Sequence, residues 1–346
     1  MNKVKVAVIG CGVIAPTHIQ CYQACEGAEL VAVCDIVEER ARKLAEQYNV
    51  PRFTTAAAEL FADPEIDAVS ICTEHYTHVD LVIAALNAGK HVVCEKCLAA
   101  SLPELDAMIA AVKAHPELVS SGIFQHRFTA INRELKAIVE EGLLGRLLTS
   151  RAQLYCERTN EYYLKDAWRG KWKSEGGSIL INQAIHFIDQ MLWISGGPAV
   201  DQKPVAMIRN LNHEGIIETD DTAAAVVPLA NGALGVIEAT SASFHIWHNT
   251  LSFEGTMGIV EIRDDKPLTV EFKDPEVQAA VAKRLADSAK PENLDFGKEY
   301  YGGGHPAQIN DFIAAIQEKR APYVSLEDAA STARVILEIY APFRKV

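Results

Sequence analysis

The sequence has no long hydrophobic run and is short of positive charge. No apolar stretch in the 346 residues reaches the roughly 18 to 20 residues that a membrane-spanning helix needs. Lysine and arginine together number 33 against 46 aspartate and glutamate, which gives a formal net charge of −13, and the basic residues form no cluster. Because phosphate contacts need grouped cations, we expect neither nucleic acid nor a membrane as a partner.

The sequence also lacks the signatures of secretion and of metal binding. The chain runs from Met1 directly into an apolar strand pattern at Val4, without the hydrophobic segment of a signal peptide, so we expect a cytoplasmic location. Most of the eight cysteines fall in apolar runs or tight turns and are expected to be reduced, buried thiols. Cys94 and Cys97 have C-x-x-C spacing, but no second cysteine pair or histidine pair completes a zinc site. We therefore predict no metal.

The length of the chain is comfortable for two domains. In the first 125 residues, short apolar runs alternate with helical patterns, which is typical of a parallel sheet covered by helices. After residue 126, β-rich runs follow one another without intervening helices, which indicates an antiparallel sheet. We predict an α/β fold in which a doubly wound Rossmann domain over residues 1–125 precedes an α+β domain over residues 126–346 with a large, mainly antiparallel sheet. Two helices are expected to close the chain.

The most informative motif follows the first apolar run. The apolar run over residues 4–9 is followed directly by a G-x-G-x-x-A sequence that starts at Gly10. A second apolar run ends at Asp35, twenty residues past Ala15. Gly10 allows a tight turn, Gly12 lets the backbone approach a pyrophosphate, and Ala15 lets the next helix lie close to the strand. The Asp35 carboxylate can accept both ribose hydroxyls and would repel a 2′-phosphate, so the motif predicts NAD. A glycine turn without a ligand is the alternative.

Two further strand ends carry polar side chains. One predicted strand ends before a stretch from Thr73 to His78 that includes His75, and the next ends in Glu95-Lys96. Ligands of a doubly wound sheet lie beyond the carboxyl ends of its strands, so these residues are candidates for the site. A lysine in this position is not expected to be an ordinary surface charge.

A second constellation begins at the glycine pair 176–177. On a continuous helix, Asn182, His186 and Asp189 would form a polar stripe beside an apolar stripe of isoleucines. The stripe carries an amide, an imidazole and a carboxylate, where a solvated face would usually carry lysine and glutamate. Imidazole suits removal of a hydroxyl proton near neutral pH, whereas a partly buried polar face with satisfied hydrogen bonds is the structural alternative.

Taken together, these motifs resemble the family of glucose-fructose oxidoreductase, inositol dehydrogenase and MocA. The resemblance covers essentially the whole chain and includes Trp168-Arg169-Gly170, the stretch His305 to Phe312, and G-G-x(4)-N-x-x-x-H-x-x-D. It implies that Lys96 is the active-site lysine of an E-K-P motif and that His186 is the acid/base histidine. Cys97 replaces the proline of that motif. Asn182 stands where many members have aspartate, so schemes that need a carboxylate there are excluded.

The resemblance implies a dehydrogenase or reductase acting on CH–OH groups of a sugar, polyol or nucleotide sugar. We expect His186 to act as the base, Lys96 to polarise the reacting oxygen, and Asn182 and Arg169 to help bind the substrate. The expected NAD contacts come from Gly10, Gly12, Val13, Ile14, Asp35, Thr73, His75, His78, Glu95 and Lys96. An NAD-dependent glycoside hydrolase that oxidises its sugar transiently and a non-catalytic NAD-binding regulator are the alternatives. A homodimer or homotetramer, joined through the second domain's sheet, is also expected.

Overall fold

The structure, a computed structural model, describes residues 3–289 and 303–344. Its internal contacts divide the chain into two compact units. Unit 1 comprises Met1–Phe128 and Asn293–Ala330, and unit 2 comprises Thr129–Glu292 and Ser331–Val346. The chain therefore comes back to unit 1 before it finishes in unit 2, a return that the sequence pattern does not indicate.

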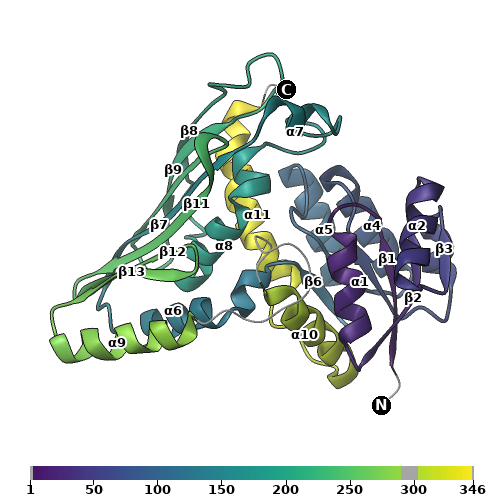
Figure 1. Ribbon diagram of the computed structural model, residues 1–346, viewed down its shortest axis with the longest axis horizontal. Coiled ribbons are helices and arrows are strands. Elements are labelled where there is room, and N and C mark those ends of the chain that lie inside the picture. Colours follow the sequence, from purple (N-terminus) through teal and green to yellow (C-terminus); the bar gives the residue numbers. More distant parts are fainter. Residues whose placement is uncertain (1–2, 290–302, 345–346) are drawn as a thin grey trace. The chain divides into compact units, whose positions relative to one another are not determined.

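Unit 1 contains a six-stranded parallel sheet in the order β3-β2-β1-β4-β5-β6 (Figure 1). Its strands are β1 (Val4–Ile9), β2 (Ala28–Cys34), β3 (Arg52–Thr54), β4 (Ala68–Ile71), β5 (His91–Cys94) and β6 (Ser120–Gly122). The strand order reverses between β1 and β4, which is where such a sheet binds its ligand. The predicted doubly wound α/β fold is confirmed.

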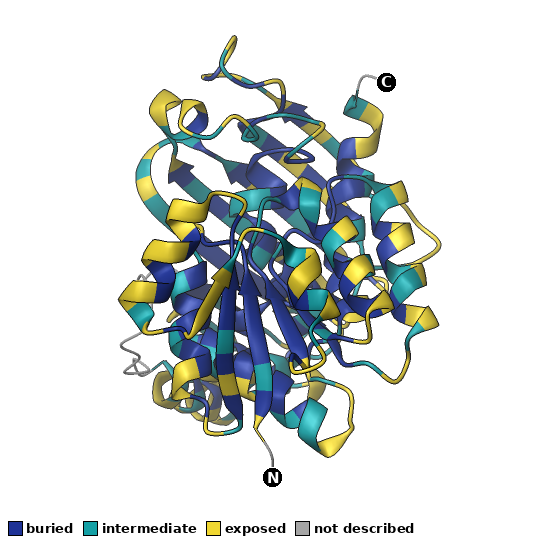
Figure 2. Ribbon diagram, turned by 90° about the vertical axis from the view of Figure 1, so that its right-hand side faces the viewer, coloured by how far each residue is buried: buried dark blue, intermediate teal, exposed yellow. Residues whose placement is uncertain are grey.

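Helices cover this sheet and bury its strands (Figure 2). The core includes Val6 and Val8 of β1, Ile19 of α1 and Phe312 of α10, all fully buried. The last of these helices comes from the late segment of the chain and packs on α1. The helices of unit 1 are α1 (Ala15–Ala24), α2 (Glu38–Tyr48), α3 (Ala57–Ala62), α4 (His75–Asn87), α5 (Leu102–Ala114), the 3-10 turn η1 (Gln125–Phe128) and α10 (Gly304–Glu318).

Unit 2 is built on a seven-stranded sheet in the order β13-β12-β11-β7-β10-β9-β8. All its neighbouring strands run antiparallel except β7 and β10, which are parallel, so the predicted large and mainly antiparallel sheet is confirmed. Its strands are β7 (Leu147–Glu157), β8 (Val205–Arg209), β9 (Thr222–Pro228), β10 (Leu234–Thr240), β11 (Ala242–Gly255), β12 (Gly258–Arg263) and β13 (Lys266–Phe272).

One face of this sheet is covered by α8, which contacts β7, β10 and β11. The helical elements of unit 2 are α6 (Ala130–Glu140), α7 (Asn160–Leu164), the π-helical turn η2 (Ile179–Gln183), α8 (Ile185–Ile194) and α9 (Pro275–Ser288). Helix α11 (Leu326–Tyr340) begins in unit 1 and ends in unit 2, and the turn η4 (Ala341–Phe343) follows it. Within the two described ranges of the chain, no helix is both long enough and apolar enough to cross a membrane.

The expected continuous helix from residue 181 onward is wrong. Residues 179–183 form a π-helical turn, in which the amide of Ala184 donates to the carbonyl of Ile179 at 2.9 Å, and α8 begins only at Ile185. The change in period breaks the predicted stripe, because side chains four apart across this turn do not share one face as they do on a regular α-helix.

Candidate active site

The glycine loop after β1 is shaped by close packing at one glycine and by open space at the other. Gly10 has a positive φ of 94°, and a Cβ there would lie 2.7 Å from the Cys72 carbonyl carbon, so a side chain is excluded by the fold itself. A Cβ on Gly12 would meet no protein atom within 4 Å. The fold alone does not require glycine at this second position, whereas close approach of a ligand phosphate does.

The start of α1 is also suited to an anion. Ile14 is the N-cap residue and has no side-chain oxygen to satisfy the first-turn N–H groups of the helix. Val13 beside it is 61% exposed, so no side chain of the described residues covers this end of the loop. An exposed, uncapped helix start after a glycine turn matches the geometry that binds pyrophosphate.

Asp35 follows β2 and closes the same loop. Its Oδ2 accepts a hydrogen bond from the amide of Cys11 at 2.9 Å, and its Oδ1 accepts one from the amide of Val37 at 2.8 Å. These two contacts fix the carboxylate next to the glycine turn. Each carboxylate oxygen has further acceptor capacity, which suits a pair of ribose hydroxyls. The residues of this loop therefore fit NAD.

The polar stretch after β4 is mostly turned inward. His78 is fully buried, with Nδ1 at 2.7 Å from the Cys97 carbonyl oxygen and Nε2 at 3.1 Å from the Thr73 carbonyl oxygen. Burial lowers the pKa of this ring, and hydrogen bonds to the two carbonyl oxygens oppose that shift. His75, at the start of α4, is buried as well. We expected a cofactor contact from His78, whereas this geometry makes it a link between the ends of β4 and β5.

Glu95, at the end of β5, lies between two histidines. Its Oε1 is 2.9 Å from Nε2 of His18 and 3.7 Å from Nε2 of His305, and its Oε2 accepts from the amide of Lys96. The other ring nitrogen of His18 lies 2.7 Å from the Ser70 hydroxyl. A direct cofactor contact is expected of Glu95 too; in the structure its oxygens contact His18, His305 and the Lys96 amide. Lys96, the next residue, is only half-buried.

Charge interactions within this buried cluster shift the pKa values of its members. Burial alone would raise the pKa of Glu95, but hydrogen bonds and charge from His18 and His305 hold the pKa well below its usual value. Burial likewise opposes a charge on His18, yet Cys72 and Glu95 together raise its pKa to about 10. The nitrogen and oxygen atoms of the cluster lie within 4.8 Å of one another, which would also suit a metal ion. The direct hydrogen bonds support an ion-paired network instead.

In unit 2, Asn182 takes its orientation from a glutamate that the sequence analysis missed. Glu175 is 1% exposed, and its two oxygens accept hydrogen bonds from the amide of Gly170 and from Nδ2 of Asn182. The carboxylate therefore sets which end of the Asn182 amide carries the nitrogen. A negatively charged residue directly before the 176–177 glycine pair was the available signal for it.

Arg169 belongs to a second polar group of unit 2. Its Nε donates to Asp166 at 3.0 Å, its Nη1 donates to the Tyr162 hydroxyl, and its guanidinium lies 4.3 Å from the centre of the Tyr162 ring. Gln183 donates to the same hydroxyl at 2.9 Å and accepts from Arg158 at 2.7 Å. The guanidinium is thus held in one orientation, as substrate recognition requires.

His186 and Asp189 lie on α8 but have different surroundings. His186 is the second residue of the helix and is half-buried. Asp189 is 1% exposed and accepts a hydrogen bond from the Thr332 hydroxyl of α11 at 2.8 Å. The structure therefore separates the expected stripe into a buried structural carboxylate and a more accessible imidazole.

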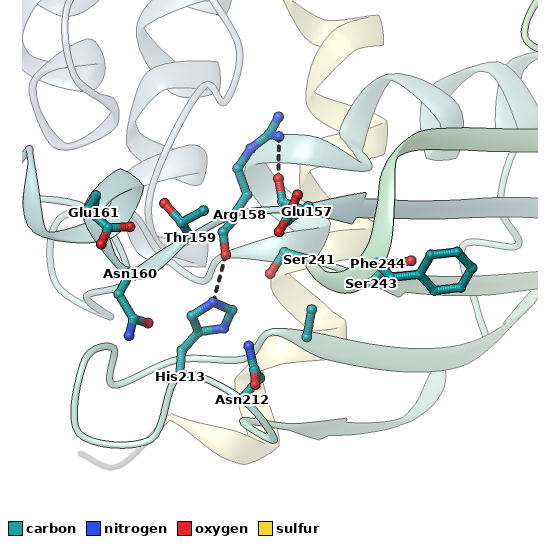
Figure 3. Close-up of a pocket in the computed structure, with 11 residues that line it drawn as sticks. Glu157, Arg158, Thr159, Asn160, Glu161, Asn212, His213, Ser241, Ser243 and Phe244 are labelled. Carbon is teal, nitrogen blue, oxygen red and sulfur yellow. Dashed lines mark hydrogen bonds between the residues drawn. The ribbon is translucent and has the colours of Figure 1, made fainter.

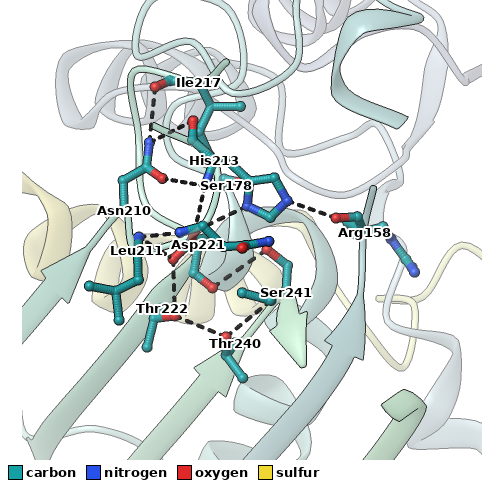
Figure 4. Close-up of polar contacts among 12 residues, drawn as sticks. Arg158, Ser178, Asn210, Leu211, His213, Ile217, Asp221, Thr222, Thr240 and Ser241 are labelled. Carbon is teal, nitrogen blue, oxygen red and sulfur yellow. Dashed lines mark hydrogen bonds and ion pairs between the residues drawn. The ribbon is translucent and has the colours of Figure 1, made fainter. Parts of the chain in front are cut away.

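An open pocket of about 460 Å³ lies in unit 2 near the ends of β7 and β10 and the start of β11. Figure 3 shows Asn160 and Glu161 on one side of it and Phe244 on the other. His213 forms part of its wall and bridges Oδ2 of Asp221, at 3.0 Å, and the Arg158 carbonyl oxygen, at 2.8 Å (Figure 4). The pocket is lined by residues other than the predicted catalytic ones.

The eight cysteines are free and buried, as expected. In the C-x-x-C pair, Cys94 donates to the Glu95 carbonyl oxygen and Cys97 to that of Ala99. Burial raises the pKa of the Cys97 thiol to about 11, so it stays protonated at neutral pH. The peptide bond between Lys96 and Cys97 is cis.

Two family models match the chain. The first, described as an oxidoreductase family with an NAD-binding Rossmann fold, matches residues 4–123. The second, described as the GFO/IDH/MocA C-terminal domain, matches residues 132–261. The two matches fall on the two sheets in the order that the sequence motifs predict.

Similar proteins include named dehydrogenases. The chain is 28% identical over 328 residues to myo-inositol 2-dehydrogenase of Thermotoga maritima, covering 94% of this chain and 91% of the relative. It is 28% identical over 334 residues to levoglucosan dehydrogenase of Pseudarthrobacter phenanthrenivorans, covering 88% of this chain and 82% of that protein. The WlbA dehydrogenase of Bordetella pertussis, solved with NADH and UDP-GlcNAcA, shares the fold with a TM-score of 0.87 at 24% identity, covering 98% of this chain and 95% of that one.

Proposed function

The chain belongs to the Gfo/Idh/MocA family of NAD-binding oxidoreductases, and on that premise we propose that it oxidises or reduces a ring carbinol of a sugar, a polyol or a nucleotide sugar. NAD, when bound, supplies the hydride chemistry. The protein itself therefore has to bind and orient the substrate and exchange a proton with it. Two relatives that cover most of the chain are named for myo-inositol and levoglucosan, both ring compounds with secondary hydroxyl groups.

His186 is proposed as the acid/base group, because an imidazole titrates close to the pH at which it must take up a hydroxyl proton. Lys96 is proposed to donate a hydrogen bond to the same oxygen and stabilise its developing negative charge. Asn182, oriented by Glu175, and Arg169, held by its own partners, are proposed to bind other groups of the substrate. An amide cannot ionise, so Asn182 contributes hydrogen bonds only.

The cofactor is proposed to lie along the glycine loop and the strand ends of unit 1. Its expected direct contacts are Gly10, Gly12, Val13, Ile14, Asp35, Thr73, His75 and Lys96. His78 and Glu95 enter the proposal as residues that fix the ends of β4 and β5, because their polar atoms face other protein groups.

One observation carries this proposal: Lys96 is half-buried at the carboxyl end of β5, in the unit whose glycine loop fits NAD. The test is a screen of polyols, aldoses and nucleotide sugars with NAD, followed through NADH absorbance. Stoichiometric NADH formation with one compound supports the proposal. Cleavage of a glycoside without net NADH would establish the hydrolase alternative, and NAD binding without turnover of any compound would favour a regulator.

Preference for NAD over NADP is proposed from Asp35, whose carboxylate is fixed beside the glycine turn. Dissociation constants for NADH and NADPH test this directly. Asp35→Ser should bring the two dissociation constants closer together, because it removes the charge repulsion with the 2′-phosphate. Tighter binding of NADPH by the unaltered protein would overturn the preference.

We also propose a homodimer or homotetramer joined through the sheet of unit 2. Val205 pairs with Val226 and Val226 with Val236, so a row of valines crosses three neighbouring strands. Val205 is 75% exposed, and Phe244, near the start of β11, is 87% exposed. Exposed apolar rows of this kind are typical of association surfaces. Light scattering at micromolar concentration that finds only the 37.8 kDa monomer would contradict this.

A further inference from the structure

The last turn of α11 packs against the glycine pair that precedes the candidate catalytic segment. A Cβ built on Gly177 would lie 2.2 Å from the Tyr340 ring, so the ring occupies the space that a side chain would need. Tyr340 is fully buried and makes an edge contact with Trp172, with ring centres 5.4 Å apart. Glycine at position 177 is therefore explained by this tyrosine.

The Tyr340 hydroxyl also has a full set of hydrogen bonds. It accepts from the amides of Ser178, at 3.3 Å, and Leu180, at 3.0 Å, and it donates to Oδ2 of Asp220 at 3.0 Å. The other oxygen of Asp220 accepts from the Ser178 amide at 3.1 Å. One phenol and one carboxylate thus satisfy the buried main-chain donors at the start of the π-helical turn.

The turn transmits this arrangement to the candidate catalytic residues. The Ser178 carbonyl accepts from the amide of Asn182 at 3.0 Å, and the Ile179 carbonyl accepts from Ala184 at 2.9 Å. Ala184 is the N-cap residue of α8, and His186 follows two positions later. The places of Asn182 and His186 are therefore fixed, through a few hydrogen bonds, by the partners of Ser178 and Leu180.

We propose that Tyr340 and Asp220 are positioning residues for Asn182 and His186, a role that rests on the proposed function of His186 in proton transfer. Neither residue has to touch the substrate. Loss of the phenolic hydroxyl leaves the buried N–H of Leu180 without this acceptor and the N–H of Ser178 with Asp220 alone, which loosens the turn and displaces the imidazole. Displacements of about 1 Å are enough to slow catalysis by about 100-fold.

Tyr340→Phe is the variant of choice, because it keeps the ring against Gly177 and removes only the hydroxyl. Tyr22→Phe is the matched control, since Tyr22 is an equally buried tyrosine of α1 in unit 1. Deuterium exchange should become faster at the amides of residues 178–186 in Tyr340→Phe and stay unchanged there in Tyr22→Phe. With NAD and the most active compound of the sugar panel, kcat should fall about 10- to 100-fold while the Kd for NADH stays within about twofold.

Unchanged exchange at these amides would overturn the proposal, and so would faster exchange with an unchanged kcat, since that describes a purely structural contact. Asp220→Asn provides a second variant if Tyr340→Phe does not fold, and it should show the same pattern to a smaller extent. Failure of the proposed function is recognised separately. In that case His186→Ala would keep its turnover, whereas the exchange data still decide whether Tyr340 and Asp220 hold the turn.

Discussion

Each unit buries a carboxylate, Glu95 directly before Lys96 in unit 1 and Asp220 behind the turn that leads to His186 in unit 2, but the two carboxylates have opposite charge preferences. Glu95 in unit 1 lies against His18 and His305, and their hydrogen bonds and charge hold its pKa well below its usual value despite burial. Asp220 in unit 2 lies against a phenol and an amide, and burial raises its pKa to about 7 although the Tyr340 hydrogen bond opposes this. Burial alone therefore does not decide whether such a group is ionised.

The groups in contact with each carboxylate therefore decide whether it is ionised. Imidazole rings can supply a full positive charge, whereas N–H and O–H donors supply only partial charges. Unit 1 thus has, beside Lys96, a carboxylate whose pKa is held low, and unit 2 has a group with a pKa of about 7 behind the turn that leads to His186. The same logic holds for Asp221, where burial would raise the pKa but main-chain donors from Leu211 and Asn212 lower it.

The largest effects should come from the catalytic candidates themselves, one from each unit. Lys96→Ala and His186→Ala should each lower turnover by about 100- to 10,000-fold, as expected for loss of a charge-stabilising or proton-transfer group, with NADH binding largely kept. Lys113→Ala and His115→Ala, in outlying positions of unit 1, are matched controls that should change turnover little. Near-normal rates in either variant, with intact thermal melting, would remove that residue from the mechanism.

Breaking the ion-paired carboxylate should be the largest effect on stability. Glu95→Ala leaves the imidazoles of His18 and His305 buried without their partner, which should cost about 3 kcal/mol of unfolding free energy. Glu65→Ala is the control, because Glu65 pairs with Lys5 at 3.6 Å on the surface and should contribute less than about 1 kcal/mol. Urea unfolding measures both. Equal losses would show that the buried network is not held by charge.

The sequence predicted the fold more fully than it predicted these carboxylates. The strands of both sheets follow from local apolar patterns, and Ser101 accepts from the Glu104 amide as the local capping sequence indicates. The glycine loop and Asp35 were recognisable because their spacing is local and fixed by the strand–turn–helix geometry.

Features that depend on residues distant in the sequence could not be predicted from local sequence patterns. The π-helical turn after the 176–177 glycine pair is hydrogen-bonded to Tyr340, 162 positions after Ser178, and the 3.6-residue period of a regular helix gave a wrong prediction for Asn182 and His186. Glu175 was overlooked because an isolated glutamate in a polar segment resembles a surface residue. His305 likewise meets Glu95 only through tertiary structure.

The titrating carboxylate predicts a smaller, pH-dependent effect on stability. The pKa of Asp220 in the folded protein, about 7, lies above the usual aspartate value of 3.8, so folding takes up a proton between these values. Its contribution is therefore fully present below about pH 4 and is lost progressively as the pH rises towards 7. Asp220→Asn should flatten this dependence.

Melting temperatures across the acid and neutral range test this. The unaltered protein should lose stability relative to Asp220→Asn between about pH 4 and about pH 7. Parallel curves would mean that Asp220 does not titrate in this range, and the contrast with Glu95 would then disappear.

The smallest effect should come from the buried thiols of unit 1. Cys94 and Cys97 are fully buried with raised pKa values, so iodoacetamide should leave both unmodified in the folded protein and activity should change less than about twofold. Unfolded protein serves as the positive control. Rapid alkylation of either thiol, or stoichiometric zinc in the purified protein, would show a reactive or metal-binding pair at the end of β5.

The position of Tyr340 also has a consequence during protein synthesis. The main-chain donors of Ser178 and Leu180 receive their phenolic acceptor only after another 160 or so residues have been made. Unit 1 is in a similar situation, since His305 and Phe312 join its earlier strands late. A nascent chain therefore cannot assemble either polar network before these late residues have been made, and the turn that leads to the candidate catalytic residues stays without its phenolic acceptor until then.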